Sequence, residues 1–156
     1  MKKIVLAMFV IFSAVACESD DNKQTGGSGS NNTPANIQFT TLAKGNVTTG
    51  SAVSPRFYVL RTQAEYNTFK EEKQLLNDLT VDFNINEVIV VFDELKTGGG
   101  YAIDVTNISR MDNKLTVKLQ SSAPQPDDTA INTQPYHAVR LQKTGLPVVF
   151  EEKAPL

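Results

Sequence analysis

Few residues of this chain are of the types that carry out enzyme chemistry. The 156-residue sequence has one histidine, His137, and one cysteine, Cys17. A catalytic site needs a nucleophile beside a base, a pair of tuned carboxylates, or a metal ion. The acidic pairs Asp93-Glu94, Asp127-Asp128 and Glu151-Glu152 are each adjacent in sequence, so on a strand their side chains point to opposite faces. We therefore expect a protein that is not an enzyme.

The same residues give little support to a metal or cofactor site. His137 would share a strand face with Val139 and Leu141, which favours a half-buried, hydrogen-bonded ring over a catalytic base. One histidine and one cysteine do not supply the several nitrogen or sulfur ligands of a zinc site. A calcium site at Asp127-Asp128 lacks the regular ligand spacing of known calcium loops. GxSxG, HExxH and Walker motifs do not occur. We expect no catalytic residue, metal or cofactor.

The segment TGGGYAIDV, Thr97 to Val105, is the strongest candidate for a binding motif. A phosphate-binding glycine loop runs from a strand into a helix, where backbone amides face the anion. Here the glycines lead into an alternating, strand-like pattern, and no lysine follows them, so a nucleotide site is not expected. Two compatible interpretations remain. The glycines form a bulged or wide hairpin turn that needs positive φ, or their bare backbone lets a partner approach closely with Tyr101 as an aromatic anchor.

The elements that must position these residues are mainly strands. Alternating or continuous apolar patterns predict strands over 37–45, 57–62, 88–92, 101–111, 114–122, 134–144 and 146–150. Asp112-Asn113 supplies a tight turn between two of them, and Gly145 supplies another. Residues 123–133, with two prolines and two aspartates, should form an exposed loop.

One helix is expected, over Gln63–Leu75. Thr62 followed by Glu65 has the spacing of a capping box, and Tyr66 and Phe69 lie at helical spacing to face a sheet. The continuous apolar run Val88–Phe92 suits a central strand covered on both faces, on one side by this helix. The predicted fold class is α+β: a mostly antiparallel sheet or sandwich-like domain of about seven strands with one helix.

The first residues, MKKIVLAMFVIFSAVAC, are typical of a secretory signal with a basic start and a short apolar core. The ending Ala14-Val15-Ala16-Cys17 resembles the lipobox of bacterial lipoproteins. This resemblance implies removal of residues 1–16 and lipidation of Cys17, which would anchor the protein to a membrane. The alternative is an ordinary signal peptide that contains a cysteine.

Residues 17–36 are rich in Gly, Ser, Asn and acidic residues, which predicts a flexible linker before a folded domain over 37–156. The cluster Glu18, Asp20 and Asp21 resembles surface-export signals of lipoproteins in some Gram-negative phyla; the alternative is a solvated linker. We expect an outer-membrane lipid-anchored protein on the periplasmic face or the cell surface. The net charge of −2, with no basic stripe, argues against nucleic-acid binding.

Four separated motifs of the domain resemble the C-terminal domain of the PrcB-like proteins, named for a bacterial protease-complex subunit. They are Asp82-Phe83, Thr97–Tyr101, Gln134–His137 and Pro147–Phe150, within a resemblance that covers roughly Val53 to Phe150. The chain departs from the family pattern by one extra glycine before Tyr101 and by Lys96 in place of proline. The resemblance implies a non-catalytic protein that associates with, or stabilises, a secreted protease or other envelope protein.

Weaker similarity exists to chagasin-type cysteine-protease inhibitors, which place two loops side by side at one end of a sandwich. Protease inhibition and a purely structural envelope role are therefore the alternatives to a protein-binding module. For the binding function the sequence predicts nine contact residues: Thr97, Gly98, Gly99, Gly100, Tyr101, Gln134, Pro135, Tyr136 and His137.

Overall fold

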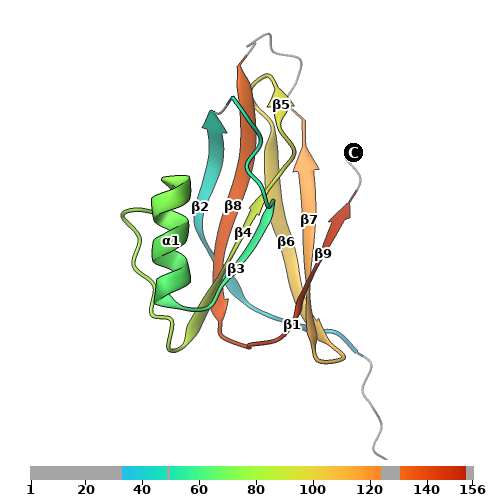
Figure 1. The fold of residues 1–156 in the computed structure, drawn as a ribbon. Coiled ribbons are helices and arrows are strands. Elements are labelled where there is room, and N and C mark those ends of the chain that lie inside the picture. Colours follow the sequence, from blue (N-terminus) through green and yellow to red (C-terminus); the bar gives the residue numbers. More distant parts are fainter. Residues whose placement is uncertain (1–32, 49, 124–130, 154–156) are drawn as a thin grey trace, which may run out of the picture. The chain divides into compact units, whose positions relative to one another are not determined.

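A computed structural model describes residues 33–48, 50–123 and 131–153, which form two packed β-sheets and one helix (Figure 1). Sheet A has the strand order β1 (Ala35–Asn36), β6 (Ala102–Met111), β7 (Lys114–Ser122) and β9 (Val148–Lys153). Sheet B has the order β2 (Phe39–Thr48), β8 (Asn132–Gln142), β4 (Asn86–Phe92) and β3 (Phe57–Leu60), and β5 (Lys96–Thr97) also pairs with β8. The predicted α+β, sandwich-like class is confirmed.

The structure has nine strands where the sequence predicted about seven. The additional strands, β1 and β5, are two residues long. β1 lies in the predicted linker and pairs with β6, so strand pairing begins at Ala35, ahead of the predicted domain start at Ile37. The chain then crosses to sheet B as β2, where the sequence predicted a single strand. Two-residue pairings carry no readable periodicity, and both side chains of β1 are exposed.

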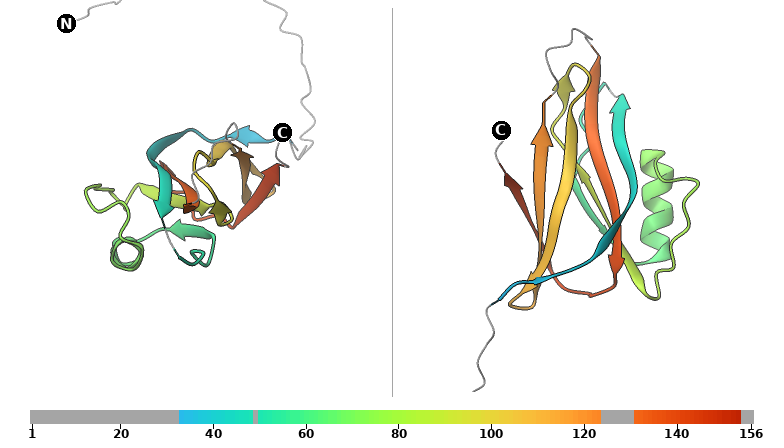
Figure 2. Two further views of the ribbon diagram at one scale, coloured as in Figure 1. Left: turned by 90° about the horizontal axis from the view of Figure 1, so that it is seen from above. Right: turned by 180° about the vertical axis from the view of Figure 1, so that it is seen from behind.

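Sheet B is covered on both faces, as predicted for its inner strand β4. Val88, Val90 and Phe92 pack with residues of α1 (Gln63–Lys73) on the outer face. The alternate residues Ile89 and Val91 pack between the two sheets. Figure 2 shows α1 outside sheet B and sheet A on the other side. β4 is therefore a buried inner strand of sheet B, and the glycine-rich segment follows it in the chain.

Helix α1 begins at the predicted capping box. The Thr62 hydroxyl accepts from the Glu65 amide at 3.2 Å, and the Glu65 carboxylate accepts from the Thr62 amide at 3.0 Å. The backbone hydrogen bond from Arg61 is the main reason that the pKa of Glu65 lies below its usual value. The helix ends at Lys73, before the predicted Leu75, because Gln74 has a φ of 54°.

Sheet A is built on the predicted hairpin of β6 and β7. Asp112 and Asn113 have φ values of 49° and 58°, as a tight turn of type I′ requires. The inward set of β7, Leu115, Val117 and Leu119, is buried as predicted. β9 pairs with β7 in parallel, an exception to the mostly antiparallel arrangement.

Candidate functional site

The glycine-rich segment links the two sheets at one end of the sandwich. β4 breaks after Phe92, β5 resumes pairing with β8, and β6 then starts in sheet A (Figure 1). We call residues 98–101 the glycine crossover. Gly98 and Gly100 have φ values of 124° and 79°, so the predicted need for positive φ is confirmed. The predicted hairpin turn is wrong, because β5 and β6 lie in different sheets.

The crossover is tied to the start of β8. The Gly98 amide donates to the Ile131 carbonyl at 3.0 Å, and the Thr133 hydroxyl donates to the Gly98 carbonyl at 2.7 Å. The two predicted site segments therefore lie side by side. Pairing of Lys96 with Thr133 continues this contact into β5.

The crossover presents an accessible surface. Thr97 and Gly100 are exposed, Gly99 and Tyr101 are half-buried, and only Gly98 is buried. Beside them Ile131 is 50% exposed, a large apolar side chain that sequence analysis missed. Its position among prolines, aspartates and threonines suggested only a loop, and an apolar residue within that polar stretch was the one available signal. Among the described residues, this end of the domain offers bare backbone, the Tyr101 ring and the Ile131 side chain.

Gln134 is buried and holds the break in β4 in place. Its side-chain oxygen accepts from the Val53 amide at 2.6 Å, and its side-chain nitrogen donates to the Asp93 carbonyl at 2.8 Å. Pro135 is also buried, and its carbonyl accepts from the Asp93 amide at 2.9 Å. Both residues are buried, and these hydrogen bonds link β8 to Val53 and Asp93. Their contact with a partner stays a prediction.

His137 is only 4% exposed, and both ring nitrogens are hydrogen-bonded. Nδ1 accepts from the Val105 amide at 3.0 Å, so the proton is on Nε2, 2.9 Å from the Thr41 hydroxyl. Burial lowers the pKa of His137, and Lys44 lowers it further, while the carboxylate of Asp104 opposes them. The expected satisfied ring is confirmed, more deeply buried than predicted, and it joins sheet B to sheet A.

Tyr136 points to the opposite face of β8 from His137. Its ring lies 3.5 Å from the position a Cβ would take on Gly45 of the adjacent strand. It also packs against Phe92, with ring centroids 6.0 Å apart. Half-buried, Tyr136 is the most accessible member of the predicted set 134–137. Contact with a partner remains a prediction for the whole set of nine residues.

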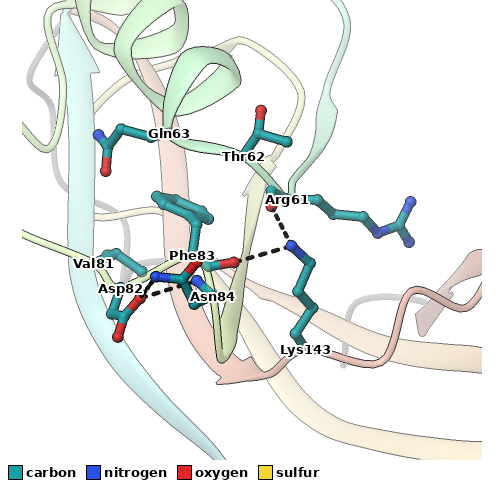
Figure 3. A pocket seen from close by; sticks show the side chains of 8 residues that line it. All are labelled: Arg61, Thr62, Gln63, Val81, Asp82, Phe83, Asn84 and Lys143. Carbon is teal, nitrogen blue, oxygen red and sulfur yellow. Dashed lines mark hydrogen bonds between the residues drawn. The ribbon is translucent and has the colours of Figure 1, made fainter.

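A pocket of about 360 Å³ lies at the other end of β8, beside the start of α1 (Figure 3). Lys143 reaches across it and donates to the carbonyls of Arg61 and Phe83, each at 2.9 Å. Asp82 accepts from the backbone and side chain of Asn84. Lys143 thus ties the loop 81–84 to the residues that lead into α1, and the bonds between Asp82 and Asn84 stabilise the loop itself.

Within 33–48, 50–123 and 131–153, no group of three or more His, Cys, Asp or Glu side chains is placed to hold a metal ion. In the same residues, no helix has the length and apolar character to cross a bilayer. Asp127-Asp128, Cys17 and residues 1–16 lie outside the described residues.

Over the described residues, the fold is a β-sandwich with one covering helix and an accessible glycine crossover at one end. Residues 88–142 match the family model described as PrcB C-terminal, so this part of the domain is similar to that family. The match runs from β4 through the crossover and the β6–β7 hairpin to the end of β8, and so contains both predicted site segments. No curated protein and no solved structure matches the chain.

Proposed function

We propose that this domain is a non-catalytic binding module that docks a protease or another envelope protein through the glycine crossover. The PrcB family match suggests association with a protease complex. The observation that carries the proposal is the exposure of Thr97, Gly100 and Ile131 with Tyr101 on one small surface. A bare backbone allows close approach, and an aromatic anchor is a common source of binding energy.

The surface is supported from below, which favours binding without rearrangement. The Gly98 carbonyl and amide are both hydrogen-bonded, and the buried Gln134 bonds to Asp93 in the break between β4 and β5. A loop fixed before binding loses less conformational entropy when the partner docks. We therefore assign contact to the crossover and Ile131, and support to Gln134, Pro135 and His137.

The inhibitor alternative has less support from this geometry. A chagasin-like tip needs two neighbouring loops, but Gln134 and Pro135 lie within strand β8 and are buried. The structural alternative predicts that substitutions at the crossover change stability alone.

We also propose that the domain is tethered to the outer membrane by lipid on Cys17, on the periplasmic face or at the cell surface. The support is the lipobox-like sequence Ala14–Cys17 and the polar stretch that follows it. Metabolic labelling with an alkyne fatty acid should label the wild-type chain and not Cys17→Ser. Equal labelling of both chains would contradict the proposal.

The docking proposal is tested by capture of envelope proteins from detergent extracts with the full-length chain. Tyr101→Ala and Ile131→Ser should each reduce the recovery of one specific partner by about tenfold or more, since aromatic and apolar anchors dominate interfaces. Ile85→Ser is the matched control, because Ile85 is 61% exposed and directly precedes β4, at the end of that strand opposite to the crossover. Unchanged recovery with both crossover variants would contradict the proposal.

A further inference from the structure

A second pocket, of about 330 Å³, opens between the two sheets next to the glycine crossover. Sheet B supplies Asp93, Glu94 and Lys96 at the break between β4 and β5, and sheet A supplies residues from β7 and β9. The sheet A residues are Leu119, Ser121, Glu152 and Lys153. The pocket thus lies beside the proposed docking surface, because Lys96 of its lining also contacts the Tyr101 ring.

Asp93 carries an unpaired acceptor at this pocket. Its side chain is 4% exposed, and Oδ1 accepts from the Glu94 amide at 2.8 Å. Oδ2 is buried and has no hydrogen-bond partner in the part of the chain that the structure describes. A buried carboxylate oxygen without a donor is costly, so a donor supplied on binding would be strongly favoured.

The neighbouring cations do not satisfy this oxygen. Arg56 lies 3.8 Å from Asp93 Oδ1 and donates instead to Glu152 at 2.7 Å. Lys96 lies 3.6 Å from the same Oδ1 atom and also sits 5.8 Å from the centroid of the Tyr101 ring. Both approach from the side of Oδ1, and Lys96 links the pocket to the crossover.

We propose that this pocket receives a basic side chain, lysine or arginine, from the protein that docks at the glycine crossover. The inference rests on the proposed function and adds the chemistry of the partner. The carboxylates of Asp93, Glu94 and Glu152 are balanced by Lys96, Lys153 and the adjacent Arg56, so the preference for a cation rests on the unpaired Asp93 Oδ2 and not on net charge. Leu119 offers an apolar wall for the aliphatic part, and Asp93 Oδ2 accepts from the charged end.

The test is an NMR titration of the ¹⁵N-labelled full-length chain with N-acetyl-arginine methylamide, and with its neutral citrulline analogue. We expect saturable shifts of the Glu94 and Ser121 amides with the arginine probe and none with citrulline. Asp93→Asn should weaken binding by about tenfold or more, because it removes a charged acceptor. Asp78→Asn, at an exposed carboxylate outside the pocket, is the matched control and should leave binding unchanged.

Three results would overturn the inference. They are equal shifts with citrulline, shifts that do not saturate at Glu94 and Ser121, and saturation with calcium chloride alone, which would assign the pocket to a free cation. Because the arginine and citrulline probes are compared on the wild-type chain, this part of the test does not depend on the folding of any variant. If the arginine probe does not bind but the protein still captures its partner, this inference is refuted and the proposed function is not. Arginine binding without any captured partner refutes the proposed function instead.

Discussion

The two predicted site segments, 97–101 and 134–137, lie side by side and differ in what they expose. In the first, Thr97 and Gly100 are exposed, and Tyr101 is half-buried. In the second, Gln134 and His137 are buried, and their side-chain polar atoms form hydrogen bonds within the domain. Under the proposed function, the first segment supplies the contact surface, and the buried residues of the second segment support it.

The comparison predicts its largest effect on stability at Gln134. Gln134→Ala should lower the free energy of unfolding by about 3 kcal/mol, because it leaves the backbone groups of Val53 and Asp93 without buried partners. Urea unfolding measures this. Gln142→Ala, on the exposed end of the same strand, should cost less than about 0.5 kcal/mol. Equal losses of unfolding free energy in Gln134→Ala and Gln142→Ala would contradict the supporting role of Gln134.

Gly98→Ala should have the next largest effect. Its φ of 124° is unfavourable for any residue with a Cβ, so the expected cost is about 2 kcal/mol. Of the three consecutive glycines, all within the described residues, Gly98 and Gly100 are the ones with positive φ. Gly99→Ala is therefore the control, with a change below about 0.5 kcal/mol in thermal or urea unfolding. A larger loss at Gly99 than at Gly98 would contradict this backbone geometry.

A smaller, pH-dependent effect is expected from His137. Burial lowers its pKa in the folded state, so below the pKa of the unfolded chain, about 6.5, the unfolded state binds more protons. Stability should be full above that pH and should fall as the pH drops further. His137→Gln removes the titrating group and should flatten this part of the profile. An unchanged slope in the variant would assign the acid sensitivity to other groups.

Tyr101→Ala should have the smallest effect on stability, about 0.5–1 kcal/mol, because the Tyr101 ring is half-buried and contacts the Lys96 ammonium group, 5.8 Å from the ring centroid. Thermal unfolding measures this, and partner capture should nevertheless be lost. If Tyr101→Ala unfolded the domain as Gln134→Ala is expected to do, the ring would belong to the scaffold.

The sequence predicted those elements of the fold that are determined by residues close together in the chain. The capping box at Thr62, the Asp112-Asn113 turn and the two covered faces of β4 were all readable from neighbouring residues. The sequence did not predict that the chain passes from one sheet to the other after β1 and again after β5, because two-residue strands leave no periodic signal.

The candidate site was predicted in part for the same reason. Three consecutive glycines before Tyr101 marked the crossover, and the alternation along β8 indicated that His137 faces the core. The burial of Gln134 depends on Val53, 81 positions away in sequence, and no local pattern encodes that contact. The exposed Ile131 and the unpaired oxygen of Asp93 likewise depend on how distant strands meet.

Site-specific photo-crosslinking in cells tests the central claim most directly. Benzoylphenylalanine would replace Tyr101 and Ile131 at the crossover, and Ile85 and Val149 elsewhere, where exposure is 61% and 42%. The account predicts a covalent adduct with the same envelope protein from both crossover positions and none from Ile85 or Val149. Adducts from Ile85 or Val149, with none from Tyr101 and Ile131, would contradict it.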